Sequence, residues 1–120
     1  MNSTQMTLLP PAADPQTAAG FVYLMTDGYL IKAGYTGRRD VKQRSGELRA
    51  ELLCFWPGSR EDERRLKAQL SPWCVGGEWC RLPDTAPMLT LLRERIEKWG
   101  GKAGLQRLDW VIVNNLRRAA

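Results

Sequence analysis

The side chains best suited to chemistry lie in one short stretch, GFVYLMTDGYLIKAGYT, which runs from Gly20 to Thr36. Tyr23, Lys32 and Tyr35 place two phenols and an ammonium group where a purely structural hairpin would have no use for polar groups. The chain has no histidine, which excludes serine–histidine and cysteine–histidine catalysis and histidine-ligated metals. Any catalysis would therefore use tyrosine, lysine, arginine and carboxylates, together with a metal ion bound by oxygen atoms.

The same stretch predicts a β-hairpin with strands over residues 21–26 and 29–35. Asp27-Gly28 between two β-rich runs is a strong hairpin signal, because a two-residue primed turn needs positive φ angles. The residues from Phe21 to Met25 are all apolar or aromatic and do not alternate with polar ones. A strand of this kind is usually covered on both faces, so we expect the hairpin at the centre of a small sheet.

The rest of the chain predicts helices around this sheet. After the hairpin we expect a helix from Asp40 to about Arg49 and a strand over Leu52–Trp56 that ends at Pro57-Gly58. A second helix follows, capped by Ser59 with Asp62, and then an edge strand over residues 78–82. The last expected elements are a helix from Pro83 to Gly100-Gly101 and a C-terminal helix. We therefore predict an α/β (α+β) fold: a three-stranded, mainly antiparallel sheet flanked by helices. We expect three parts along the chain. Residues 1–19, which are rich in proline, should form a flexible arm, residues 20–99 the folded domain, and residues 100–120 a helical extension.

The composition indicates a small globular protein. Its 120 residues are 43% hydrophobic and 26% charged, and no apolar run is long enough to cross a membrane. The N-terminus also lacks the pattern of a signal peptide, so we expect a cytoplasmic protein without a membrane partner. Its three cysteines lack paired zinc-ligand spacing, which favours reduced thiols over a zinc site. The net charge of +5 permits a polyanionic partner.

Five short motifs follow one another between residues 20 and 82. They are Phe21-Val22-Tyr23, Lys32-Ala33-Gly34-Tyr35-Thr36, Arg44 with Leu48 one turn later, Pro57-Gly58 followed by Glu63 and Leu66, and Gly77-Glu78-Trp79-Cys80. In this order and spacing they resemble the GIY-YIG nuclease superfamily, and most closely its phage-type branch with a Lys-Ile-Gly second motif. The chain departs from that branch at Ala33, where isoleucine is usual, and at Lys67, where histidine is usual. The superfamily's late asparagine has no clear counterpart here.

The resemblance implies a GIY-YIG-like fold and a divalent-metal-dependent endonuclease that hydrolyses DNA phosphodiester bonds. Glu63 would bind one Mg²⁺ or Mn²⁺ ion, and Arg44 would hold a nonbridging phosphate oxygen. Tyr23, close to Lys32 across the hairpin, would take a proton from the attacking water, and Tyr35 would position that water or the phosphate. These five residues are the predicted catalytic set. We expect Tyr23, Arg44 and Glu63 to converge on one solvent-open hollow.

Basic residues flank the predicted site on both sides. The predicted nucleic-acid-binding residues are Arg38, Arg39, Lys42, Arg60, Arg64 and Lys67. Such a concentration fits phosphate tracking, and we expect DNA rather than RNA as the partner. Two alternatives stay open at this point: a non-catalytic nucleic-acid-binding module on the same fold, and a protein-interaction factor whose partner the sequence does not identify.

Overall fold

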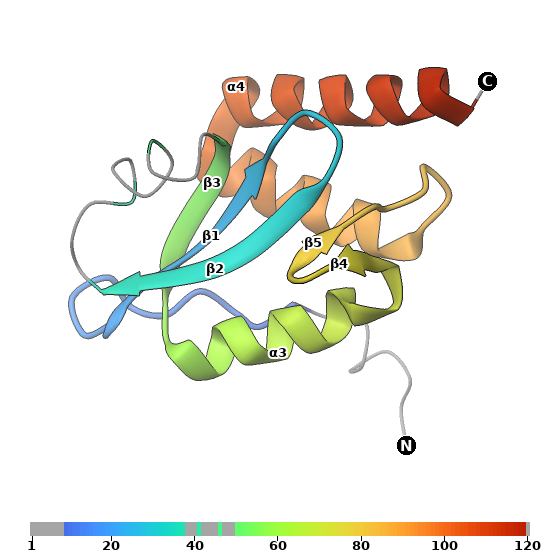
Figure 1. The fold of residues 1–120 in the computed structure, drawn as a ribbon. Coiled ribbons are helices and arrows are strands. Elements are labelled where there is room, and N and C mark those ends of the chain that lie inside the picture. The colour runs from blue at the N-terminus through green and yellow to red at the C-terminus, as the bar shows by residue number, and fades with distance from the viewer. Residues whose placement is uncertain (1–8, 38–40, 42–45, 47–49, 120) are drawn as a thin grey trace.

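The computed structural model describes residues 9–37, 41, 46 and 50–119, and its centre is an antiparallel sheet (Figure 1). The strands are β1 (Gly20–Thr26), β2 (Ile31–Gly37), β3 (Glu51–Gly58), β4 (Cys74–Gly76) and β5 (Trp79–Cys80), in the spatial order β3-β1-β2-β5-β4. The described helices are α3 (Arg60–Leu70), the short 3-10 helix η1 (Ser71–Trp73) and α4 (Pro87–Ala119). The predicted α+β class is confirmed.

The prediction of a three-stranded sheet is wrong, because the sheet has five strands. The two additional strands, β4 and β5, form a short hairpin in the turn-rich segment after α3. Strand β5 joins the sheet through only two register pairs, Ile31 with Cys80 and Lys32 with Trp79. Strands of this length are too short to show the alternation of apolar and polar residues that identifies a strand. The sequence therefore predicts one edge strand over residues 78–82 and not a hairpin.

The central hairpin is confirmed, but the loop between its strands is longer than a two-residue turn. Four residues, Asp27 to Leu30, separate β1 from β2. The Asp27 side chain accepts hydrogen bonds from the backbone N–H groups of Tyr29 and Leu30, at 2.9 and 2.8 Å. Gly28 has a φ angle of 106°, which a glycine adopts without strain. The aspartate side chain therefore holds a wider loop than a primed turn would give.

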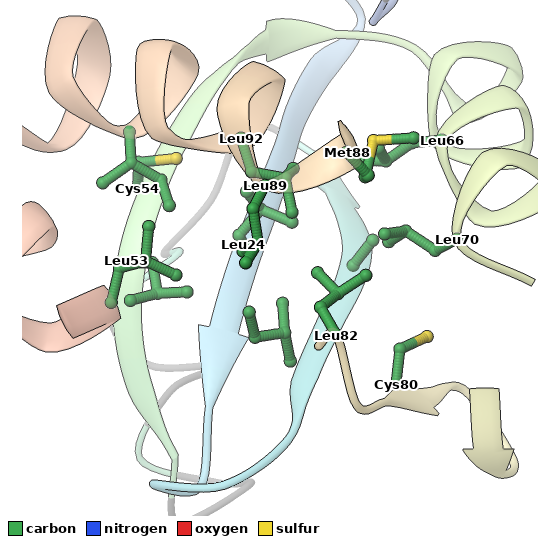
Figure 2. Packing of buried hydrophobic residues seen from close by; sticks show 14 of the residues in the cluster. Leu24, Leu53, Cys54, Leu66, Leu70, Cys80, Leu82, Met88, Leu89 and Leu92 are labelled. Atoms are coloured by element: carbon green, nitrogen blue, oxygen red, sulfur yellow. The ribbon is translucent and has the colours of Figure 1, made fainter. Parts of the chain in front are cut away.

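The two faces of the sheet pack into different clusters. Residues on one face, including Val22 and Leu24 of β1, form the main core with α3 and α4; Figure 2 shows Leu24 among Leu66, Leu70 and Leu92. The opposite face carries a second cluster of buried side chains, Tyr23, Met25 and Val41, with partly buried Phe21, Ala50, Leu52 and Phe55 around it. The sheet is thus covered on both sides, as the apolar run from Phe21 to Met25 predicts.

Helix α3 begins where its sequence predicts. The Ser59 hydroxyl accepts a hydrogen bond from the Asp62 backbone N–H at 3.2 Å, and the Asp62 carboxylate accepts one from the Ser59 N–H at 3.0 Å. This capping box satisfies two backbone donors that the first turn of the helix leaves free. It also fixes the position of the first residues of α3 relative to the end of β3.

Helix α4 consists of two segments that meet at Gly101, whose φ of 65° is not helical. The predicted stop at Gly100-Gly101 is therefore seen as a kink, and the predicted C-terminal helix follows it. Both segments contribute to the main core, the first through residues such as Leu92 and Ile96 and the second through Leu108 and Val111. No helix in the described part of the chain is long and apolar enough to cross a membrane.

The described part of the predicted N-terminal arm contacts the domain. The Ala13 N–H donates a hydrogen bond of 2.8 Å to the carbonyl oxygen of Pro57 in β3. The Arg95 guanidinium on α4 donates one of 2.7 Å to the carbonyl oxygen of Pro10 and lies 4.5 Å from the ring centre of Trp56. Residues 9–13 are therefore held against both β3 and α4.

Candidate active site at the edge of β2

Four charged side chains form a row of ion pairs that links β2, the turn of the edge hairpin β4–β5 and helix α3. Glu78 lies in the turn between β4 and β5, and its Oε2 accepts a hydrogen bond of 2.8 Å from the Lys32 ammonium on β2. Its other oxygen, Oε1, contacts the Lys67 ammonium on α3. One carboxylate thus joins the second strand, the β4–β5 turn and helix α3.

Glu63 continues this row along α3. Lys67 lies one helical turn after Glu63, and its Nζ is 3.0 Å from Glu63 Oε2. Glu63, Leu66 and Leu70 all lie on the buried side of the helix, so the Glu63 carboxylate lies at the margin of the core, where 12% of its side chain is exposed. We call Lys32, Glu78, Lys67 and Glu63 the edge cluster.

The pKa values in the edge cluster follow from these contacts. Hydrogen bonds from Lys32 and then from Lys67 lower the pKa of Glu78 to about 2. Burial alone would lower the pKa of Lys67, but its hydrogen bonds with Glu78 and Glu63 outweigh that effect and raise this pKa above its ordinary value. At neutral pH Glu78 is therefore ionised and Lys67 carries a proton.

Two carboxylates, Glu63 and Glu78, flank the single ammonium group of Lys67. Mg²⁺ and Mn²⁺ prefer oxygen ligands, and Mg²⁺ is commonly bound by only one or two carboxylates, with water completing its coordination. The donor set therefore fits one hard divalent cation, provided that the Lys67 ammonium moves aside. Within the described residues, no group of three or more acidic or cysteine side chains forms a metal site.

Tyr23 lies on the face of the sheet opposite to α3. It pairs with Gly34 across the β1–β2 ladder, and the phenol lies so close to Gly34 that a Cβ atom there would overlap its ring and hydroxyl. Only 2% of Tyr23 is exposed, since Met25 and Val41 pack around it. The expected solvent-open hollow containing Tyr23 is therefore not seen.

Tyr35 lies on the other face, because it pairs with Val22 in the same ladder and its neighbours in β2 alternate in direction. Its ring packs against the main core, and the Arg60 guanidinium at the start of α3 lies 5.0 Å from the ring centre. The two tyrosines of the predicted catalytic set are therefore separated by the sheet. Tyr35 is close to α3 and Tyr23 is close to Val41.

The structure brings together some of the predicted residues and leaves others apart. Lys32, Glu63 and Lys67 meet in the edge cluster, and Arg60 and Arg64 are exposed on α3. Four predicted residues lie outside the described part of the chain: Arg38, Arg39, Lys42 and Arg44. The predicted helix over residues 40–49 also lies mostly outside it, although Val41 and Gly46 are helical.

Glu78 is the member of the edge cluster that the prediction missed. The sequence contains Glu78 as part of the motif Gly77-Glu78-Trp79-Cys80, and its position directly after two glycines in a turn is the signal that could identify it. Two asparagines near the end of α4 have a structural role. Asn114 and Asn115 donate hydrogen bonds of 2.8 Å to the carbonyl oxygens of Gly28 and Tyr29, respectively, in the β1–β2 loop.

Comparison of the chain with protein-family models, with curated proteins and with solved structures found no match. The geometry of the edge cluster and the order of the sequence motifs are therefore the basis for any functional conclusion.

Proposed function

We propose that this protein is a divalent-metal-dependent endonuclease that hydrolyses phosphodiester bonds in DNA at the edge cluster. The observation that carries the proposal is the meeting of Lys32 and Glu63 in one charge cluster. The two residues come from different motifs, and Glu78 and Lys67 join them through direct ion pairs. The resemblance of these motifs to those of the GIY-YIG nucleases supports the same assignment.

In this proposal Glu63 and Glu78 hold the cation, which would offset the charge that develops on the phosphate during hydrolysis. Lys32 contributes an ammonium group next to Glu78 and can bind a nonbridging phosphate oxygen. Arg60 and Arg64, exposed on α3, contact the DNA backbone beside the site.

Two observations favour a second candidate, a nucleic-acid-binding module without cleavage activity. The Lys67 ammonium is 3.0 Å from the predicted metal ligand Glu63, so it neutralises the carboxylate that the cation needs. Tyr23, the predicted proton acceptor for the attacking water, is only 2% exposed and lies on the face of the sheet opposite to α3 and Glu63. Exposed basic residues would still give salt-dependent binding to DNA, because each phosphate contact releases counterions.

A cleavage assay separates the two candidates. Supercoiled plasmid and single-stranded DNA are incubated with the protein and Mg²⁺ or Mn²⁺, and binding is measured in parallel at two salt concentrations. The endonuclease proposal expects nicked product that is lost when Glu63 is changed to Gln. Glu61→Gln is the matched control, because Glu61 is an exposed acidic residue in the first turn of the same helix.

Binding without nicking would support the module without activity and contradict the endonuclease. Cleavage that survives Glu63→Gln would show that the carboxylate does not hold the cation. Absence of any salt-sensitive binding to DNA would contradict both candidates.

A further inference from the structure

Two of the three cysteines lie directly opposite one another in the β4–β5 hairpin. Cys74 pairs with Cys80 in the antiparallel ladder, and their Sγ atoms are 2.7 Å apart. Opposite residues in such a ladder have Cα atoms about 4.5–5.5 Å apart, which lies within the range that a disulfide spans. A bond of about 2.05 Å between these sulfur atoms therefore requires small side-chain rotations and no movement of the strands.

The two thiols have different access to solvent. Cys74 is exposed, whereas Cys80 is 1% exposed and is packed in the main core near Leu70 and Leu82 (Figure 2). A cavity of about 260 Å³ lies beside both cysteines and also borders Lys67, Leu70 and Glu78. A small oxidant can therefore reach Cys74 first, with Cys80 already in contact behind it.

We propose that Cys74 and Cys80 are a redox modification site that forms a reversible intramolecular disulfide with hydrogen peroxide as oxidant. The Cys74 thiolate attacks one peroxide oxygen, the O–O bond breaks, and hydroxide leaves, which yields a sulfenic acid on Cys74. The Cys80 sulfur then attacks the Cys74 sulfur, the S–O bond breaks, and the oxygen leaves as water with the Cys80 proton. The two thiols lose two electrons in total, and the peroxide gains them.

Oxidation acts on the turn that carries Glu78. The disulfide closes a short ring from Cys74 to Cys80 around Gly76, Gly77 and Glu78, and Gly77 adopts a left-handed φ of 55° in this turn, which a glycine does without strain. Closing this ring restricts the turn, so that the Glu78 carboxylate is held more firmly between Lys32 and Lys67. This inference does not depend on the proposed nuclease function.

The test uses the full chain, reduced and then treated with hydrogen peroxide, followed by denaturation, alkylation of free thiols and peptide mass spectrometry. We expect alkylation to be lost at Cys74 and Cys80 together, with a mass decrease of two hydrogen atoms, while Cys54 is still alkylated. A thiol reductant should restore alkylation of both. Cys54→Ala is the control for the third thiol, since Cys54 is buried on β3 and should not affect the result.

Cys74→Ser keeps an exposed polar side chain at its position and tests the order of events. In this variant Cys80 should remain fully alkylated after peroxide treatment. Three results would overturn the proposal: further oxidation of Cys74 while Cys80 stays free, covalent dimers formed through Cys74, or equal oxidation of Cys54. The wild-type experiment alone distinguishes these outcomes, so it does not depend on whether a Cys80 variant folds.

Discussion

The Nζ atom of Lys67 lies 3.0 Å from Oε2 of Glu63, one turn earlier in α3, and the same ammonium group contacts Glu78. The position between the two carboxylates thus already holds a positive charge. A divalent cation would compete with this charge for the same oxygen atoms. The balance between the lysine and a cation decides whether the edge cluster binds a metal.

Changing Lys67 to Met removes this competing charge and keeps a long apolar side chain. We expect binding of Mn²⁺, measured by isothermal titration calorimetry, to strengthen about fivefold, because the loss of a partly exposed ion pair is worth about 1 kcal/mol. Arg64→Met is the matched control, since it removes an exposed positive charge from the same helix. Equal affinities for the two variants would show that Lys67 does not occupy the cation position.

Glu78 should make the stability of the protein depend on pH in a defined range. Its pKa is lowered from 4.5 to about 2 in the folded state, so its ion pairs stabilise the fold above pH 4.5 and lose their effect as the pH falls from 4.5 towards 2. Because 47% of the side chain is exposed, we expect at most about 1 kcal/mol. Urea unfolding of the wild type and Glu78→Gln should therefore differ at pH 7 and converge near pH 2. A difference that is the same at both pH values would contradict this assignment.

Local signals predicted the elements near the site better than they predicted its geometry. The Ser59–Asp62 capping box and the break at Gly101 each depend on a few neighbouring residues. Both can therefore be predicted from the residue types at those positions. The pairing of β5 with β2 depends on contacts between residues far apart in the chain. For that reason the strand number was wrong and the role of Glu78 was missed.

The separation of the two tyrosines follows from the alternation of side chains along the paired strands. Tyr23 and Tyr35 belong to neighbouring strands, and which face each one occupies is set by the register, Tyr23 with Gly34 and Val22 with Tyr35. The loop is two residues longer than expected, which moves the partner of Tyr23 from Lys32 to Gly34 but leaves every side chain on its face. Tyr23 and Tyr35 therefore lie on opposite faces with either loop length, whereas the burial of Tyr23 depends on packing by residues far away in the chain, such as Val41.

Gly34→Ala should destabilise the protein, because the new methyl group would overlap the Tyr23 phenol, which has no open space to move into. We expect a loss of about 1–3 kcal/mol in the free energy of unfolding, as for other insertions into a packed interior. Gly37→Ala is the control, since a Cβ at Gly37, the last residue of β2, would meet no other atom within 4 Å. Its effect on the free energy of unfolding should stay within about 0.5 kcal/mol. Urea unfolding of both variants checks this, and equal midpoints would be evidence against the close packing of Tyr23 on Gly34.

Asn114 connects the second segment of α4 to the β1–β2 loop, where its Nδ2 donates a 2.8 Å hydrogen bond to the Gly28 carbonyl oxygen (Figure 1 shows the loop beside this segment). Asn114→Ala leaves a partly buried carbonyl without this donor, so we expect a loss of about 1 kcal/mol in stability. Amide hydrogen exchange should also become faster in residues 27–30, which the helix holds in place. Gln106→Ala, an exposed change in the same segment, should alter neither quantity. If exchange in the loop were unchanged in Asn114→Ala, this hydrogen bond would not be what holds the loop, and its order would come from its other contacts, the Asp27 side chain and the bond from Asn115 to the Tyr29 carbonyl oxygen.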